Sequence, residues 1–416
     1  MMIALALLVA VALLTLVHWY VWRRVVRDVS APGSAWRRTG TVLAVVLPLL
    51  SLGALAGGRA LPIAAERWLA WPGYLWLAVL LYLVLGLLVG EAVRPLLLRA
   101  RRGSAPQPER EPVPAGAVGA EPSEGEARAE GPATGARPGP ADPSRRLLVA
   151  RGVAIAAGGA AAAVVGNGAH GVLRGPRLKQ VTVPLAKLPR QAHGYRIAVV
   201  SDIHLGPILG RAHTQRIVDT INSAQPDLIT VVGDLVDGSV ADLGPAAEPL
   251  ARLRARDGAY FVTGNHEYFS GAAEWVDFVR DLGVHPLENA RTELTHFDLA
   301  GVNDIAGTAE GQGPDYDRAL ADRDRTRAAV LMAHQPVAVH EAVRRGVDLQ
   351  LSGHTHGGQL WPGNYLAELA NPTVAGLERY GDTQLYVTRG AGAWGPPVRV
   401  GAPSDITIVT LASLRA

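Results

Sequence analysis

The chain has 416 residues, a formal net charge of +3 at pH 7 and no cysteine. Its length exceeds that of one typical domain, and the absence of cysteine excludes disulfides and thiolate metal ligands. The small positive charge does not indicate nucleic-acid binding, because it comes almost wholly from arginine, and the arginines cluster beside apolar stretches.

Three long uncharged apolar stretches lie near the N-terminus, at residues 2–22, 41–58 and 73–90. As helices with a rise of about 1.5 Å per residue, each is long enough to cross a hydrocarbon layer of roughly 30 Å. We therefore predict a transmembrane region with three helices over residues 1–100. The first stretch does not resemble a cleaved signal peptide, because it lacks an early basic region and further apolar stretches follow it.

A change of composition separates this region from the rest of the chain. Residues 101–145 are rich in Pro, Gly, Ala and Glu with almost no large apolar side chain, which predicts a disordered linker. A softer apolar stretch at 152–169 follows. We predict that residues 146–170 form a fourth transmembrane helix or a signal anchor that resembles a twin-arginine export signal, the alternative being a cytoplasmic surface helix.

The arginines predict an orientation in the membrane. They cluster between the first two apolar stretches, after the third, and at the start of the fourth, and the positive-inside rule places these segments in the cytoplasm. If the fourth segment inserts, the protein is a multi-pass protein of the cell membrane with its C-terminal half extracytoplasmic.

The C-terminal half, residues 190–416, alternates strand-like apolar runs with amphipathic segments, which predicts an α/β domain. The runs are RIAVV, DLITVV, AYFVT, AAVLM and LQLS. Two late runs, QLYVTRGAG and DITIVTL, have no helical segment between them, and we expect them in a second sheet of mixed strand direction.

Nitrogen and oxygen donors follow directly after these runs, in the fragments SDIHLG, GDLVDG, GNHE, AHQP and GHTHGGQ. An open α/β sheet gathers its ligand site at the carboxyl ends of its strands. Imidazole and carboxylate donors without sulfur suit manganese, iron or zinc. Seven ligands suffice for two divalent ions, which together could clamp a phosphoryl group. The candidate metal ligands are Asp202, His204, Asp234, Asn265, His334, His354 and His356.

The five fragments, in this order, resemble the motifs of the calcineurin-like metallophosphoesterases over roughly residues 195–411. The resemblance implies a four-layer αββα sandwich in which Asp234 bridges two ions. It assigns one ion to Asp202, His204 and His356, and the other to Asn265, His334 and His354. Gly238 stands where the phosphoprotein phosphatase branch carries an arginine, which disfavours that branch.

Two further residues receive roles from the resemblance. His266 would act as general acid for the leaving oxygen or as a donor to the developing charge, and Asp237 would orient it. An Asp-Gly turn explains Asp237 about as well. Arg389 and Arg399 are the available cations for a phosphate, although a structural role is the simpler interpretation of each.

Apolar helices beside this motif set resemble the membrane-linked bacterial branch, which includes cell-wall phosphodiesterases and hydrolases of lipid-linked UDP-sugars. We therefore predict a membrane-anchored phosphoesterase that uses two divalent ions, manganese being preferred, and a metal-bound hydroxide. It would hydrolyse phosphodiester, phosphomonoester or pyrophosphate bonds of an envelope or lipid-linked substrate. The alternative is a non-catalytic membrane scaffold or nucleotide-sensing module with the same fold. A transporter fused to a hydrolase is disfavoured, because the first three stretches lack buried charges. No nucleic-acid partner is expected, and the sequence leaves the oligomeric state open.

Overall fold

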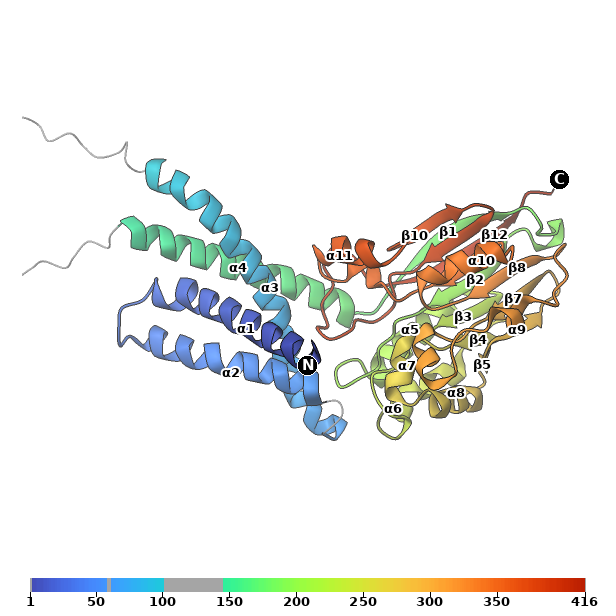
Figure 1. The fold of residues 1–416 in the computed structure, drawn as a ribbon, viewed down its shortest axis with the longest axis horizontal. Coiled ribbons are helices and arrows are strands. Elements are labelled where there is room, and N and C mark those ends of the chain that lie inside the picture. Colours follow the sequence, from blue (N-terminus) through green and yellow to red (C-terminus); the bar gives the residue numbers. More distant parts are fainter. Residues whose placement is uncertain (1, 58–60, 101–144, 416) are drawn as a thin grey trace, which may run out of the picture. The chain divides into compact units, whose positions relative to one another are not determined.

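The N-terminal part of the chain is helical. The computed structural model describes residues 2–57, 61–100 and 145–415 (Figure 1). The helices of this part are α1 (Met2–Trp22), a π-helical turn (Arg23–Arg27), α2 (Ala35–Gly57), α3 (Ile63–Ala100) and α4 (Arg145–Leu173). Except for Arg145, the predicted linker over 101–145 lies outside the described residues.

Within the described residues, three helices are long and apolar enough to cross a membrane: Ala35–Gly57, Ile63–Leu98 and Arg146–Leu173. The first predicted stretch, 2–22, coincides with the continuous helix α1. The softer stretch at 152–169 lies within α4, because alanine is the best helix former and offsets the glycines.

The described chain divides into two compact units, one of Met1–Gly40 with Val84–Gly158 and one of Thr41–Leu83 with Gly159–Ala416. In the first unit, Gly90 of α3 lies so close to Val153 of α4 that any side chain at Gly90 would collide with it. Small residues allow helices to pack this closely. In the same unit, Arg24 Nε lies 3.0 Å from Glu91 Oε1 and neutralises that acid.

The second unit contains two six-stranded sheets, which with their helices form what we call the two-sheet body (residues 177–415). The first sheet has the order β1 (Arg177–Leu185), β12 (Asp405–Ser413), β2 (Tyr195–Val200), β3 (Leu228–Val232), β4 (Ala259–Val262) and β5 (His285–Pro286). The second has the order β10 (Gly376–Tyr380), β11 (Thr383–Val387), β9 (Leu349–Ser352), β8 (Ala328–Met332), β7 (Phe297–Gly301) and β6 (Ala290–Glu293).

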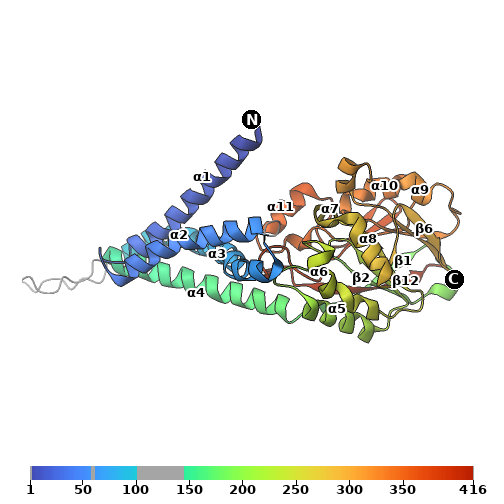
Figure 2. The same ribbon diagram turned by 90° about the horizontal axis from the view of Figure 1, so that it is seen from below.

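The sheets pack face to face and helices cover their outer faces. Ile197, Val199, Val330 and Leu351 belong to the apolar core between the sheets. A second core joins the first sheet to α5 (Arg211–Ala224), α6 (Val240–Ala247) and α8 (Ala272–Asp281), and a third joins the second sheet to α9 (Tyr316–Leu320) and α10 (Val339–Arg344). Figure 2 shows α9 and α10 on the side opposite α5. The result is the predicted four-layer αββα sandwich.

The placement of the last strand differs from the prediction. Of the two late runs expected in a second sheet, β11 lies there, but β12 lies in the first sheet between β1 and β2. The first five residues of β12 are buried, and a strand buried in this way needs neighbours on both edges. Its outer neighbour is β1, which the sequence did not predict, so the body begins at Arg177 rather than at residue 190.

Strands β2, β3 and β4 run parallel to one another, as do β8 and β9. Their carboxyl ends carry the donor fragments, because each fragment follows its strand directly. Parallel pairing therefore brings five separate loops to one edge of the sandwich.

One buried histidine on α5 makes the stability of this body depend on pH. The His213 side chain is buried, and burial, with the nearby Arg216 and Arg399, lowers its pKa to about 4. In the unfolded chain the pKa is about 6.5, so the unfolded state binds the proton more readily. The stabilisation is complete above about pH 6.5 and is lost as the pH falls towards 4, by about 3 kcal/mol.

We expect the variant His213→Leu to show a flatter dependence of thermal unfolding temperature on pH between 6.5 and 4 than the parent chain. The measurement is thermal unfolding of the full chain in detergent over that range. His193→Leu, at an exposed position, should retain the parent slope. A parental slope in His213→Leu would show that this imidazole does not govern the acid response.

Candidate metal centre

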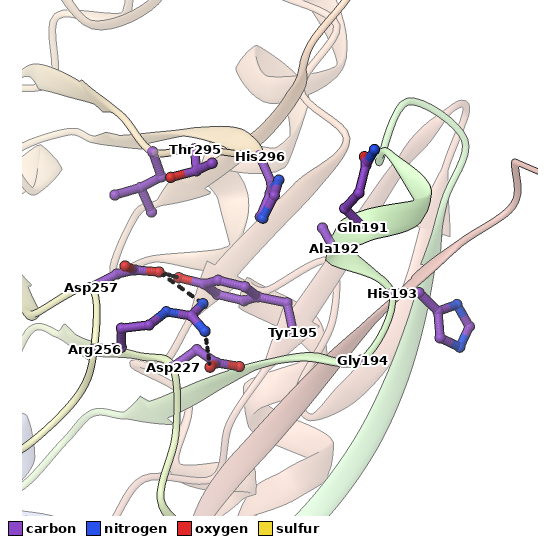
Figure 3. Close-up of a pocket in the computed structure, with 11 residues that line it drawn as sticks. Gln191, Ala192, His193, Gly194, Tyr195, Asp227, Arg256, Asp257, Thr295 and His296 are labelled. Atoms are coloured by element: carbon purple, nitrogen blue, oxygen red, sulfur yellow. Dashed lines mark hydrogen bonds and ion pairs between the residues drawn. The ribbon is translucent and has the colours of Figure 1, made fainter.

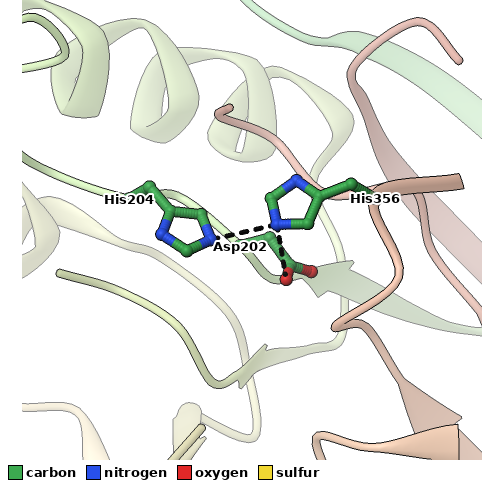
Figure 4. Close-up of side chains that lie close together, drawn as sticks. All are labelled: Asp202, His204 and His356. Atoms are coloured by element: carbon green, nitrogen blue, oxygen red, sulfur yellow. Dashed lines mark hydrogen bonds and ion pairs between the residues drawn. The ribbon is translucent and has the colours of Figure 1, made fainter. Parts of the chain in front are cut away.

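The loops after β2, β3, β4, β8 and β9 bring the seven predicted ligands into one cluster. Asp202, His204 and His356 form a first group in which one ligand atom of each lies within 4.8 Å of the others. His204 Nε2 lies 3.0 Å from His356 Nε2, which is 3.4 Å from Asp202 Oδ1 (Figure 4). Two imidazole nitrogens and a carboxylate oxygen thus converge on one small volume.

A second group contains Asp234, His334 and His354 within the same limit. His334 Nδ1 lies 2.8 Å from the carbonyl oxygen of Val232, to which it can only donate. This hydrogen bond leaves Nε2 as the ring nitrogen of His334 that could serve as a metal ligand. Asn265 joins the group through its Oδ1, 3.0 Å from His354 Nδ1.

The carboxylate of Asp234 belongs to the second group and, with His204 and His266, to a third group within the same limit. Its Oδ2 is 3.1 Å from His334 Nε2 and 3.7 Å from His204 Nε2, while its Oδ1 accepts a hydrogen bond of 2.9 Å from the backbone N–H of His266. Burial acts to raise the pKa of Asp234, but His334 and His204 outweigh it and hold the pKa well below its usual range. The group is therefore an anion that faces both sets of imidazoles.

The backbone is strained at these residues. Among the described residues, eight other than glycine have positive φ, and five of them are predicted ligands: Asp202 (52°), His204 (49°), Asp234 (53°), His354 (73°) and His356 (52°). Left-handed conformations in such residues cost on the order of 1 kcal/mol each and cluster at functional sites. Gly264 lies so close to Asp234 that a Cβ at this position would collide with the Asp234 carboxylate, so no larger residue fits there.

Glu267 holds two of these loops together and is not among the predicted site residues. Its buried carboxylate accepts hydrogen bonds from the backbone N–H groups of Asp234 (3.0 Å), Leu235 (2.7 Å) and Gly264 (2.6 Å). Burial and the neighbouring Asp234 raise the pKa of Glu267 to about 7, while the donated N–H groups act in the opposite direction. In the sequence, the feature that could have pointed to Glu267 is its position directly after His266 in the fragment GNHE.

Arg399 performs a similar task for His356. The buried guanidinium donates to the carbonyl oxygens of Gly392 (2.7 Å), His356 (3.0 Å) and Ala402 (3.1 Å), and its Nη2 lies 3.1 Å from His356 Nδ1. Of the two arginines considered for phosphate, Arg399 is thus engaged in supporting the loop. Neither it nor Arg389 lines the cavity described below.

Asp237 links His266 to the cluster. Its Oδ1 lies 2.7 Å from His266 Nδ1 and 2.9 Å from His204 Nδ1. Burial acts to raise the pKa of Asp237, but the two imidazoles outweigh it and lower the pKa to about 2. The ring of His266 reaches towards solvent, with its centroid 5.7 Å from that of Trp394.

A cavity of about 560 Å³ opens over the cluster. Its floor carries His204, Asp234, Asn265, His354 and His356, and apolar side chains form much of its wall: Ala54, Leu55, Ile208, Leu209, Phe269 and Trp394. Glu66 and Tyr74 of α3 also line it, within the same compact unit. Of the tryptophans at 361 and 394, only Trp394 lines this cavity.

A second pocket of about 300 Å³ lies beside the start of β2 (Figure 3). Its charged groups pair with one another or with Tyr195: Tyr195 Oη donates to Asp257 Oδ2 at 2.6 Å, and Arg256 contacts Asp227 at 3.1 Å and Asp257 at 3.3 Å. Within the described residues, the groups of donors able to hold a metal ion all belong to the cluster above. The cluster is therefore the candidate functional site.

Comparison with known proteins agrees with this placement. The family model for calcineurin-like phosphoesterases matches residues 195–358. An uncharacterized metallophosphoesterase of Aquifex aeolicus is 34% identical over 240 residues, which cover 56% of this chain and 91% of that protein. Another, from Bacillus subtilis, is 30% identical over 271 residues, which cover 61% of this chain and 93% of that protein.

A longer relative is also similar to this chain. A transmembrane protein with metallophosphoesterase domain from Danio rerio is 40% identical over 250 residues, 57% of each chain. The match thus spans little more than half the length of this relative.

Because Glu267 positions two metal-site loops, we expect Glu267→Gln to weaken metal binding by about 10- to 100-fold, the usual effect of removing an outer-shell partner. The Mn²⁺ affinity of the full chain is measured by titration calorimetry. Glu274→Gln, at an exposed position on α8, is the matched control and should bind as the parent does. Parental affinity in Glu267→Gln would contradict the positioning role.

Proposed function

Because the chain belongs to the calcineurin-like phosphoesterase family, we propose that it is a membrane-anchored, metal-dependent phosphoesterase. The observation that carries the proposal is that the Asp234 carboxylate faces both His204 and His334, which belong to different groups of imidazole and carboxylate donors. In this proposal the protein is a multi-pass protein of the cell membrane, with its site on the extracytoplasmic side, as the arginines beside the apolar helices favour.

The donor set suits two divalent cations of the manganese, iron or zinc type, and manganese is our preferred choice. Asp202, His204 and His356 would hold one ion, Asn265, His334 and His354 the other, and Asp234 would be shared. When bound, such a pair activates water and neutralises charge on a phosphoryl group. The donor groups fit such cations, because each consists of oxygen and nitrogen atoms within 4.8 Å of one another and contains no sulfur.

His266 would serve the leaving group. Its Nδ1 is engaged by Asp237, so its Nε2 is the nitrogen left to donate a proton or a hydrogen bond to the leaving oxygen. Asp237 fixes the tautomer and the orientation of the ring, as a carboxylate commonly does for an active-site histidine.

The charges around the cavity favour a phosphodiester. Among the described residues that line it there is no arginine or lysine, whereas Glu66 adds an acidic side chain. A phosphomonoester carries nearly two negative charges at pH 7, and a diester carries one. The apolar wall and the membrane helices favour an amphiphilic substrate, such as a lipid-linked or envelope phosphodiester.

We expect the full chain with added Mn²⁺ to hydrolyse bis-p-nitrophenyl phosphate, and the pair Asp234→Asn with His356→Ala to lower kcat/KM by at least about 100-fold. Chelation should abolish turnover and Mn²⁺ should restore it. His193→Ala, remote from the cluster, is the control. Activity that survives the double substitution would refute the assignment of the site. Bound metal without turnover of any phosphate ester would instead favour the scaffold alternative.

The charge of the cavity gives a separate expectation. Glu66→Gln should lower KM for p-nitrophenyl phosphate several-fold with little change for the diester, because it removes repulsion of the second negative charge. Glu274→Gln lies outside the cavity and should change neither value. Equal effects on both substrates would show that Glu66 does not discriminate by charge.

A further inference from the structure

Helix α11 (Gly363–Ala370) presents apolar side chains to the outside of the two-sheet body. It contains no buried residue, and the exposed fractions are 84% for Leu369, 72% for Leu366 and 59% for Tyr365. These three residues share one face of the helix, since they are spaced three and four apart. Trp361, just before the helix, is 50% exposed. A contiguous apolar surface of this kind on a polar body indicates an interaction site.

The membrane helix α4 contacts the segment next to this surface. Gly168 of α4 lies so close to Val398 that a Cβ there would stand 2.7 Å from its side chain, and Val172 packs with Leu209 and Ala393. The segment 392–400 of the two-sheet body is therefore a contact site for α4. All these residues belong to the same compact unit.

Trp361 is joined to that segment and to a second membrane helix. Its backbone N–H donates to the carbonyl oxygen of Val400 at 2.9 Å, and its own carbonyl oxygen accepts from Tyr82 Oη of α3 at 2.9 Å. Only three residues separate the end of α4 at Leu173 from β1 at Arg177, a reach of at most about 14 Å. The apolar surface is thus held close to the C-terminal end of α4 and, through Tyr82, to the middle of α3, two helices that can cross a membrane.

We propose that α11 and Trp361 form an interfacial anchor that lies in the headgroup region of the bilayer and fixes the two-sheet body to the lipid surface. Tryptophan and tyrosine favour this region, and leucines on one face of a helix insert below it. The helix carries no arginine or lysine, so apolar burial rather than attraction to anionic lipid drives the docking. Because α3 and α4 contact the region beside this surface and can cross a bilayer, lipid is the partner that we expect to cover it.

The absence of cysteine makes a direct test possible in the full chain. A nitroxide is attached to Leu369→Cys, and the protein is placed in phosphatidylcholine nanodiscs that hold one copy each. Power saturation then compares collisions with oxygen and with a water-soluble nickel chelate. We expect the ratio of oxygen to nickel accessibility to be several-fold higher than for Glu310→Cys, an exposed position remote in sequence. Glu368→Cys, about 100° round the same helix, should give an intermediate ratio.

Each other outcome overturns the proposal. Equal ratios at positions 369 and 310 would show that water covers the helix. Protection from both reagents, in detergent as well as in discs, would show that protein covers it. Protection that appears only in discs holding two copies would assign the surface to a second copy of the chain.

A second variant guards against a local disturbance by the label at position 369. With the label on Tyr365→Cys, the added pair Leu366→Glu and Leu369→Glu should lower the accessibility ratio to that of position 310. Turnover of the water-soluble aryl diester should stay at the parental level, which verifies the fold. The accessibility measurement needs no turnover, so it remains decisive if the proposed phosphoesterase activity fails. A ratio unchanged by the two glutamates would refute the anchor.

Discussion

The site depends on one anion held between opposing imidazoles. Asp234 Oδ2 faces His204 from the loop after β2 and His334 from the loop after β8, so a single carboxylate connects the two sheets at their common edge. A buried carboxylate is costly unless charges or hydrogen bonds compensate for lost hydration. The parallel strands β2, β3 and β4 of the first sheet and β8 of the second place the compensating groups there.

Supporting residues offset the cost of this arrangement. Five of the predicted ligands have left-handed backbone conformations, which persist only where neighbours impose them. Glu267 fixes the loops after β3 and β4 through three backbone N–H groups, and Arg399 fixes the loop of His356 through its carbonyl oxygen and its ring. The ligands are thereby held in place by the protein itself, which lowers the reorganisation needed when cations bind.

The sequence predicted the parts of the structure that short segments determine. Apolar runs followed by donors located β2, β3, β4, β8 and β9 with their ligands, since a strand and the loop after it form one local pattern. It did not predict β1 or the place of β12, because pairing between residues 177–185 and 405–413 depends on contacts more than 200 residues apart. The role of Glu267 also escaped, because its partners are backbone N–H groups, which have no sequence signature.

The composition of the cavity wall bears on how a phosphate would be recognised there. With no arginine or lysine among its described lining residues, a phosphoryl group would be attracted by the cations that the cluster would hold and by His266, so binding and reactivity would use the same groups. Discrimination between substrates then falls to the apolar wall and Glu66, which act on the substituents and on the net charge of the ester. A singly charged ester with an apolar substituent suits both the apolar side chains of the wall and Glu66. In water such an amphiphile is scarce, but at a membrane it is concentrated, and this gives a physical reason for joining the site to helices that can span a bilayer.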